Sequence, residues 1–69
     1  MKISGSIIRA HIDWVVGHAS RDEIIEFFEM LPPDVRSTIS HMRASASYDE
    51  TTLCAVERTI DAMFGKAWH

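Results

Sequence analysis

Helix start and stop signals divide this chain into short segments, and they constrain its fold more than any other feature. Ser20 and Glu23 have the spacing of a capping box, in which each side chain bonds an otherwise unpaired amide at the start of a helix. Pro32 and Pro33 end one helix and suit the first turn of the next. Gly65 is a typical residue just beyond the end of a helix. The chain is therefore expected to form several short helices.

These signals predict helices over residues 6–16, 20–31, 33–44 and 48–65. Gly17 is the expected stop of the first helix, and Ser47 with Glu50 repeats the capping-box spacing before the fourth. No alternation of polar and apolar residues is sustained, so we expect no strand. At 69 residues the chain has room for one domain. The sequence thus predicts an all-α fold, a compact bundle of four short helices in a single domain over residues 1–69.

The apolar residues of these segments indicate the core, because positions three and four apart share a helix face. The fourth helix has the clearest stripe and the third the thinnest. The predicted core consists of Trp14, Phe27, Phe28, Leu31, Ile39, Leu53, Val56, Ile60 and Phe64.

The first helix is apolar over about two thirds of its circumference, more than a core face needs. Its apolar residues are Ile7, Ile8, Ala10, Ile12, Trp14, Val15 and Val16. A domain of this size buries only about 60% of its unfolded surface, and with Cys54 as its only cysteine it forms no internal disulfide. A partner chain would supply the missing stability. We therefore predict a homodimer, with Ile8, Ile12 and Val16 at the interface.

The net charge of −3 is concentrated in residues 21–34, which carry one arginine and five carboxylates. Asp22, Glu26 and Glu29 share the outer face of the second helix. Such a face steers association and selects partners, and this one predicts another protein with a basic patch. A solvated face that only keeps the chain soluble is the alternative interpretation.

A helix-turn-helix DNA reader is a second alternative, because the third helix presents a row of polar side chains. These are Arg36, Ser37, Thr38, Ser40, His41 and Arg43. A basic face formed by Arg36, Arg43 and Arg58 would favour this interpretation. The chain has no basic stripe in its sequence, however, and the acidic second helix would repel phosphate. We therefore expect no binding of nucleic acid.

The residues that most often carry chemistry form no recognisable site. Of four histidines, His11 and His18 share a face but lie two helical turns apart, about 10 Å, too far for one zinc ion. Cys54 lies among apolar neighbours, which predicts a buried, unreactive thiol. We expect no enzyme activity, no metal and no cofactor. With no signal peptide or membrane segment in the sequence, a cytoplasmic location is expected.

Four short pieces of the sequence carry a resemblance. They are Gly5-Ser6-Ile7-Ile8, Leu31-Pro32-Pro33, Tyr48 in its serine-rich joint, and Ile60 to Phe64-Gly65. Together they resemble the N-terminal half of an uncharacterised family expanded in myxobacteria, and distantly the N-terminal helical part of haem-based nitric-oxide sensor domains. The family pattern has proline after the tyrosine, where this chain has Asp49.

The resemblance implies an all-helical fold and a bacterial signalling context, with no known activity. The haem-ligating part of the sensors lies beyond this chain, so haem binding does not carry over, although a fragment of a haem or metal sensor remains an alternative. The favoured expectation is a small protein-binding or regulatory module.

Overall fold

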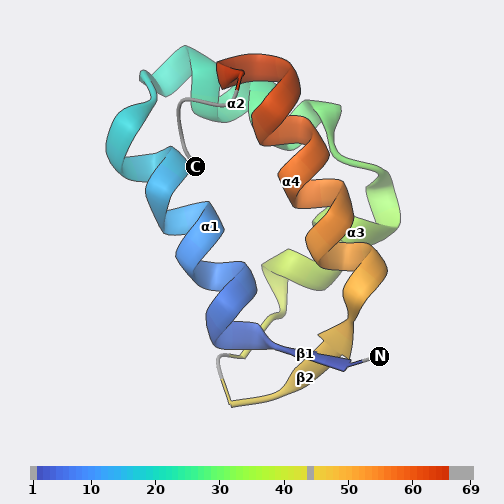
Figure 1. The fold of residues 1–69 in the computed structure, drawn as a ribbon. Coiled ribbons are helices and arrows are strands. Elements are labelled where there is room, and N and C mark those ends of the chain that lie inside the picture. Colours follow the sequence, from blue (N-terminus) through green and yellow to red (C-terminus); the bar gives the residue numbers. More distant parts are fainter. Residues whose placement is uncertain (1, 44, 66–69) are drawn as a thin grey trace.

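The computed structural model describes residues 2–43 and 45–65, which form four helices and two short strands (Figure 1). In chain order the elements are β1 (Lys2–Ser4), α1 (Gly5–His18), α2 (Arg21–Met30), α3 (Pro33–Ser40), β2 (Ser47–Asp49) and α4 (Glu50–Phe64). The radius of gyration is 11.2 Å, close to the roughly 11 Å expected of a folded chain of this length. Within the described ranges no helix is long and apolar enough to cross a membrane.

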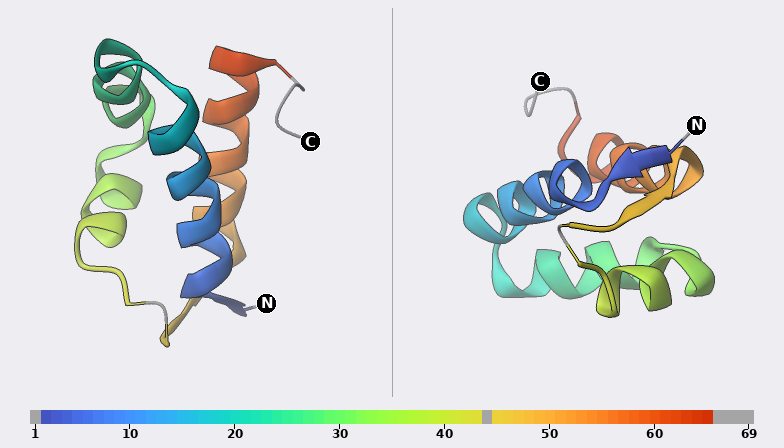
Figure 2. Two further views of the ribbon diagram at one scale, coloured as in Figure 1. Left: turned by 90° about the vertical axis from the view of Figure 1, so that its left-hand side faces the viewer. Right: turned by 90° about the horizontal axis from the view of Figure 1, so that it is seen from below.

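The helices lie in two layers. Helices α1 and α4 lie side by side in one layer, and α2 and α3, joined at Leu31 and Pro32, form the other (Figure 2). Both layers place an apolar face toward the space between them, as helices that share one core must. The predicted helical bundle is therefore confirmed in its main features.

A two-stranded antiparallel sheet is the feature that the sequence did not predict. β1 pairs with β2 in the register Lys2↔Asp49, Ile3↔Tyr48 and Ser4↔Ser47. In each strand only the central residue is partly buried. A three-residue strand is too short to display the alternation by which strands are recognised. The fold is therefore mostly helical, and the strictly all-α prediction is wrong.

The sheet also changes the start of the fourth helix. Ser47 and Tyr48 pair with β1, so the predicted capping box at Ser47 is wrong. Asp49 caps α4 instead, and its Oδ1 accepts a hydrogen bond of 3.1 Å from the amide of Thr51. The capping box of Ser20 and Glu23 is confirmed, with hydrogen bonds of 2.8 and 3.2 Å.

Two helix ends also differ from the prediction. Helix α1 continues through Gly17 to His18, whereas α3 ends at Ser40, well before the predicted residue 44. The amides of His41 and Met42 bond to carbonyls three residues back, at 3.2 Å each. Hydrogen bonds of this kind tighten the last turn of the helix, and α3 ends there. Residue 44 itself lies outside the described residues.

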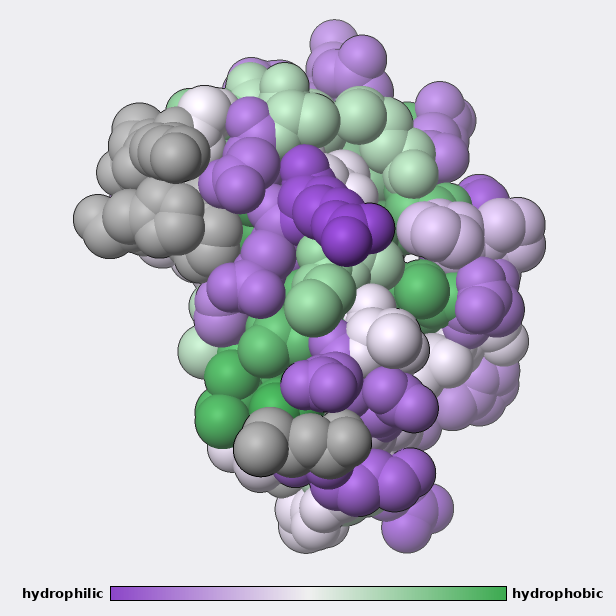
Figure 3. Space-filling view, turned by 45° about the vertical axis from the view of Figure 1, so that its right-hand side comes forward, coloured by the Kyte–Doolittle hydropathy of each residue, from purple (hydrophilic) through white to green (hydrophobic). Residues whose placement is uncertain are grey.

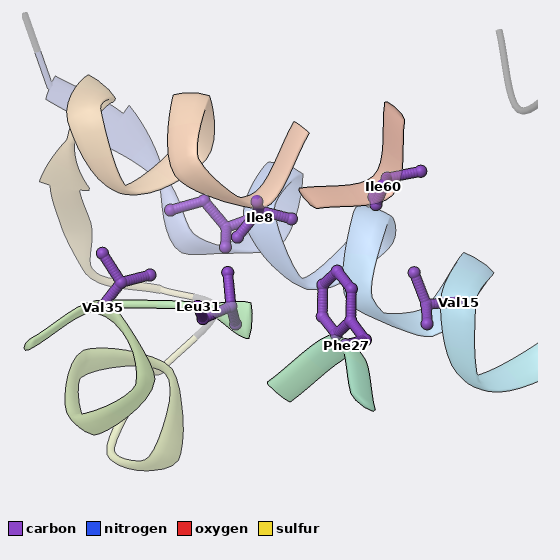
Figure 4. Packing of buried hydrophobic residues seen from close by; sticks show 7 residues of the cluster. Ile8, Val15, Phe27, Leu31, Val35 and Ile60 are labelled. Atoms are coloured by element: carbon purple, nitrogen blue, oxygen red, sulfur yellow. The ribbon is translucent and has the colours of Figure 1, made fainter. Parts of the chain in front are cut away.

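The core fills the space between the layers (Figure 4). Its buried apolar residues are Ile8, Val15, Phe27, Leu31, Val35, Val56 and Ile60. The predictions for Phe27, Leu31, Val56 and Ile60 are thus confirmed. The other predicted core residues, Trp14, Phe28, Ile39, Leu53 and Phe64, are partly buried and pack against this cluster.

Close packing between the start of α1 and the α3–β2 connection holds the base of the fold together. The amide of Gly5 donates to the carbonyl of Ala46 at 2.8 Å, and the hydroxyl of Tyr48 accepts from the amide of Arg43 at 2.8 Å. A Cβ atom on Gly5 would overlap the carbonyl oxygen of Arg43 and lie 3.0 Å from the ring of Tyr48. Glycine is required here because the two backbones approach so closely.

Candidate functional site

The outer face of α2 carries three carboxylates, which we call the acidic ridge: Asp22, Glu26 and Glu29. All three side chains are exposed, as the sequence predicts for the face opposite the buried Phe27. None of them forms an ion pair or a hydrogen bond with another described residue. Unpaired carboxylates on one helix face create a local negative potential that attracts a basic partner.

Two large apolar side chains lie on either side of the acidic ridge. Ile25 is 49% exposed and Met30 is 48% exposed. At 100° per residue Ile25 lies about 40° to one side of Glu29, and Met30 lies about 40° to the other side of Glu26. A methionine adapts its shape to different partners. The ridge therefore combines charge with apolar surface, a combination that the sequence did not reveal, because periodicity alone does not show how exposed Ile25 and Met30 are.

The predicted dimer residues on α1 do not form one exposed surface. Ile8 is completely buried in the core and is therefore unavailable to a second chain. Ile12 is partly buried and packs against the core, whereas Val16 is 53% exposed. The prediction is wrong for Ile8 because this side of α1 packs against both α4, in its own layer, and the second layer, so Ile8 belongs to the core.

The other large apolar residue exposed on α1 lies elsewhere. Ile7 is 46% exposed, but it precedes Val16 by nine residues, which places the two on opposite sides of the helix. The wide apolar arc is thus divided by the core face. On the side of the molecule in Figure 3, hydrophobic surface likewise lies in separate areas between hydrophilic side chains.

An aromatic contact joins the ends of α1 and α4. Trp14 stacks on the ring of His18 with their centroids 4.5 Å apart, and its other neighbour, Phe64, meets it edge-on at 5.5 Å. The spacing of Trp14 and His18, four residues apart on a helix, is a signal by which this pair could have been found. The contact packs two helix ends together beside the core cluster, against which the partly buried Trp14 also packs.

The histidines make local bonds to the backbone. His11, His18 and His41 each use the ring Nδ1 to bond the carbonyl four residues earlier, at 2.8, 2.8 and 3.0 Å. Because a carbonyl only accepts, each Nδ1 carries the proton. His11 Nε2 also lies 3.8 Å from a carboxylate oxygen of Glu57. His69 lies outside the described residues, among which no group of three or more histidine, cysteine or acidic side chains could hold a metal.

Cys54 is exposed, so the prediction of a buried thiol is wrong. The buried face of α4 is formed by Thr52, Val56, Thr59 and Ile60. Cys54 lies two residues from both Thr52 and Val56, about 160° around the helix from each, and therefore faces away from the core. Apolar neighbours in the sequence did not indicate the direction in which this side chain points.

The arginines of the DNA-reader alternative are distributed over three elements. Arg36 lies on α3 and is partly buried, Arg43 lies in the connection after α3, and Arg58 is exposed on α4. The hydroxyls of Thr38 and Ser40 donate to carbonyls of their own helix, each at 2.9 Å. The polar side of α3 thus uses part of its hydrogen-bonding capacity locally.

Comparison of this chain with protein-family models, with characterised proteins and with solved structures found no match.

Proposed function

We propose that this chain is a small protein-binding module rather than an enzyme, and that it acts in a bacterial regulatory system. The observation that carries the proposal is the acidic ridge of Asp22, Glu26 and Glu29, flanked by the half-exposed Ile25 and Met30. Charged residues that have no partner among the described residues steer association, and adjacent apolar side chains supply the surface that a partner buries.

The proposed partner is a protein with a basic patch beside an apolar groove. Its lysines or arginines would face the acidic ridge, and its groove would accept Ile25 or Met30. Because the ridge is exposed, its attraction is screened over about 8 Å at physiological salt. Binding should therefore weaken as salt concentration rises.

The proposed state of the module is a homodimer in a signalling context. Val16, 53% exposed on α1, supports a second contact surface away from α2. The signalling context rests on the resemblance of the Gly5-Ser6-Ile7-Ile8 and Leu31-Pro32-Pro33 pieces to the myxobacterial family. Protein binding is favoured over DNA reading because α3, with only eight residues, ends before His41 and Arg43.

A comparison of charge reversals tests the proposal. Wild-type protein and the Glu26→Lys variant are immobilised and exposed to a bacterial lysate, and captured proteins are quantified at low and at physiological salt. A basic partner should be captured by the wild type at low salt, lost at higher salt, and lost with Glu26→Lys.

Asp34→Lys is the matched control, because it makes the same change of charge at an exposed position outside the acidic ridge. It should retain the partner. If both variants retain the partner with unchanged dependence on salt, the ridge is only a solvated surface and the proposal is wrong. Circular dichroism verifies that both variants are folded.

A further inference from the structure

Helix α1 has a side that no other described element covers, which we call the α1 outward face: Ser6, Arg9, Ala10, Asp13, Val16 and Gly17. All of these residues are exposed. Ser6, Arg9, Asp13 and Val16 recur at intervals of three, four and three residues, the spacing at which two helices pack lengthwise. A Cβ atom on Gly17 would meet nothing within 4 Å, so another helix can approach closely there.

The charges of this face are complementary to themselves. Arg9 and Asp13 lie one helical turn apart, with the arginine nearer the helix start, the less favourable order for pairing within one helix. Neither forms an ion pair with another described residue. In a twofold dimer the same patch faces itself, so each residue of one chain meets a different residue of the other. A patch with one charge of each sign satisfies this symmetry when the helices are antiparallel.

We propose that a second copy of this chain packs antiparallel along the α1 outward face, around a twofold axis at residue position 11. Arg9 of each copy then lies opposite Asp13 of the other, and Ser6 lies opposite Val16. This proposal rests on the homodimer in the proposed function and specifies its surface and register. The acidic ridge of α2 cannot form such a pair, because a twofold axis there would place carboxylates against carboxylates.

The small size of the face limits the strength of the contact. Fourteen residues make a helix about 21 Å long. One such face is small beside the roughly 800 Å² that each partner buries in a standard interface. A dissociation constant in the micromolar range or weaker therefore follows, and it should increase with salt because the paired charges are exposed.

Charge exchange at this face tests the register. Sedimentation equilibrium is measured for the wild type, Arg9→Glu, Asp13→Arg and the double variant that carries both. Each single variant places like charges opposite each other twice and should weaken the dimer by about tenfold or more. The double variant restores opposite charges and should recover the dissociation constant of the wild type to within about threefold.

Arg58→Glu is the matched control, since it makes the same charge change at an exposed position on α4, and it should dimerise like the wild type. If circular dichroism shows that a charge-reversed variant is unfolded, Arg9→Gln and Asp13→Asn replace it, because they remove a charge without adding repulsion. Each of these should weaken the dimer by a smaller factor than the reversal does. If the single variants dimerise like the wild type, the proposed register is wrong, but the proposed homodimer is not contradicted. A wild type that is monomeric throughout overturns the homodimer as well, whereas binding at the acidic ridge is decided by the Glu26→Lys experiment.

Discussion

Two glycines on α1 differ in what surrounds them. Gly5 is buried where a Cβ atom would overlap the carbonyl oxygen of Arg43, whereas a Cβ atom on Gly17 would extend into open space. The sequence assigned a structural role to Gly17, which was expected to end the first helix. It assigned none to Gly5, which was noted only as the first residue of a segment that resembles the myxobacterial family. The requirement for glycine at position 5 arises from a residue 38 positions away, and no local pattern encodes it.

The same substitution should therefore have opposite effects at these two positions. Gly5→Ala should destabilise the fold by about 1–3 kcal/mol, because backbone must move to admit the methyl group. Gly17→Ala should stabilise it by about 0.5–1 kcal/mol, since alanine loses less entropy than glycine in a helix. Urea denaturation measures both. Equal effects at the two positions would contradict the close approach of α1 and the α3–β2 connection.

Asp49 makes stability depend on pH. The amide of Thr51, followed by the Thr51 hydroxyl, lowers the pKa of Asp49 below its ordinary value of 3.8, and the positive charge of Lys2 acts in the same direction. A carboxyl group whose pKa is lower in the folded state stabilises the fold above its ordinary pKa, and this contribution is lost as the pH falls through the folded value.

Asp49→Asn tests this charge while keeping a residue that caps helices well. The wild type should be more stable than the variant near neutral pH, and the difference in unfolding free energy should shrink below about pH 4. Chemical denaturation over a pH series measures this difference. A difference that stays constant down to pH 2 would show that the carboxylate charge at the cap contributes nothing.

Among the elements, those defined by local signals were predicted best. The capping box fixed the start of α2, and the two prolines fixed its end, because both act through neighbouring atoms. The end of α4 at Gly65, which has a φ of 66°, follows from glycine's tolerance of that conformation. β1 and β2 were missed because their pairing joins residues more than 40 positions apart in the sequence.

Cys54 on α4 also shows that local sequence does not determine which way a side chain points. Its orientation, away from the core, implies a thiol that reagents reach without unfolding. A disulfide exchange reagent should therefore modify the folded protein as fast as a short unstructured cysteine peptide, within about tenfold. Cys54→Ser should change the unfolding free energy by less than about 0.5 kcal/mol, as expected of a surface position. Modification that requires denaturant would contradict this orientation.

At the scale of the whole molecule, the candidate surfaces were predicted unequally. The acidic ridge follows from helical periodicity alone, so sequence was sufficient to locate Asp22, Glu26 and Glu29. The α1 surface required knowledge of which side the other helices cover. The structure excludes the buried Ile8 from the proposed dimer interface, leaves Val16 in it, and adds Arg9 and Asp13 to it. The sequence could not show this, because burial is decided by packing between distant segments.

The central claim is that this small domain has two separate binding surfaces: the α1 outward face binds a second copy of the chain, and the acidic ridge binds a different protein. Self-association should therefore perturb the α1 outward face and leave the acidic ridge unchanged. The Glu26→Lys variant should accordingly dimerise like the wild type, because its charge change lies on α2 rather than on α1.

The most direct measurement is an NMR series of ¹H–¹⁵N correlation spectra of the wild type over a range of concentrations, from about 10 to about 500 micromolar, which brackets a micromolar dissociation constant. Amide shifts along the α1 outward face, around Arg9, Asp13 and Val16, should move progressively with concentration. Those around Glu26 and Glu29 on α2 should stay fixed. Spectra that do not change with concentration, or changes confined to α2, would contradict the account.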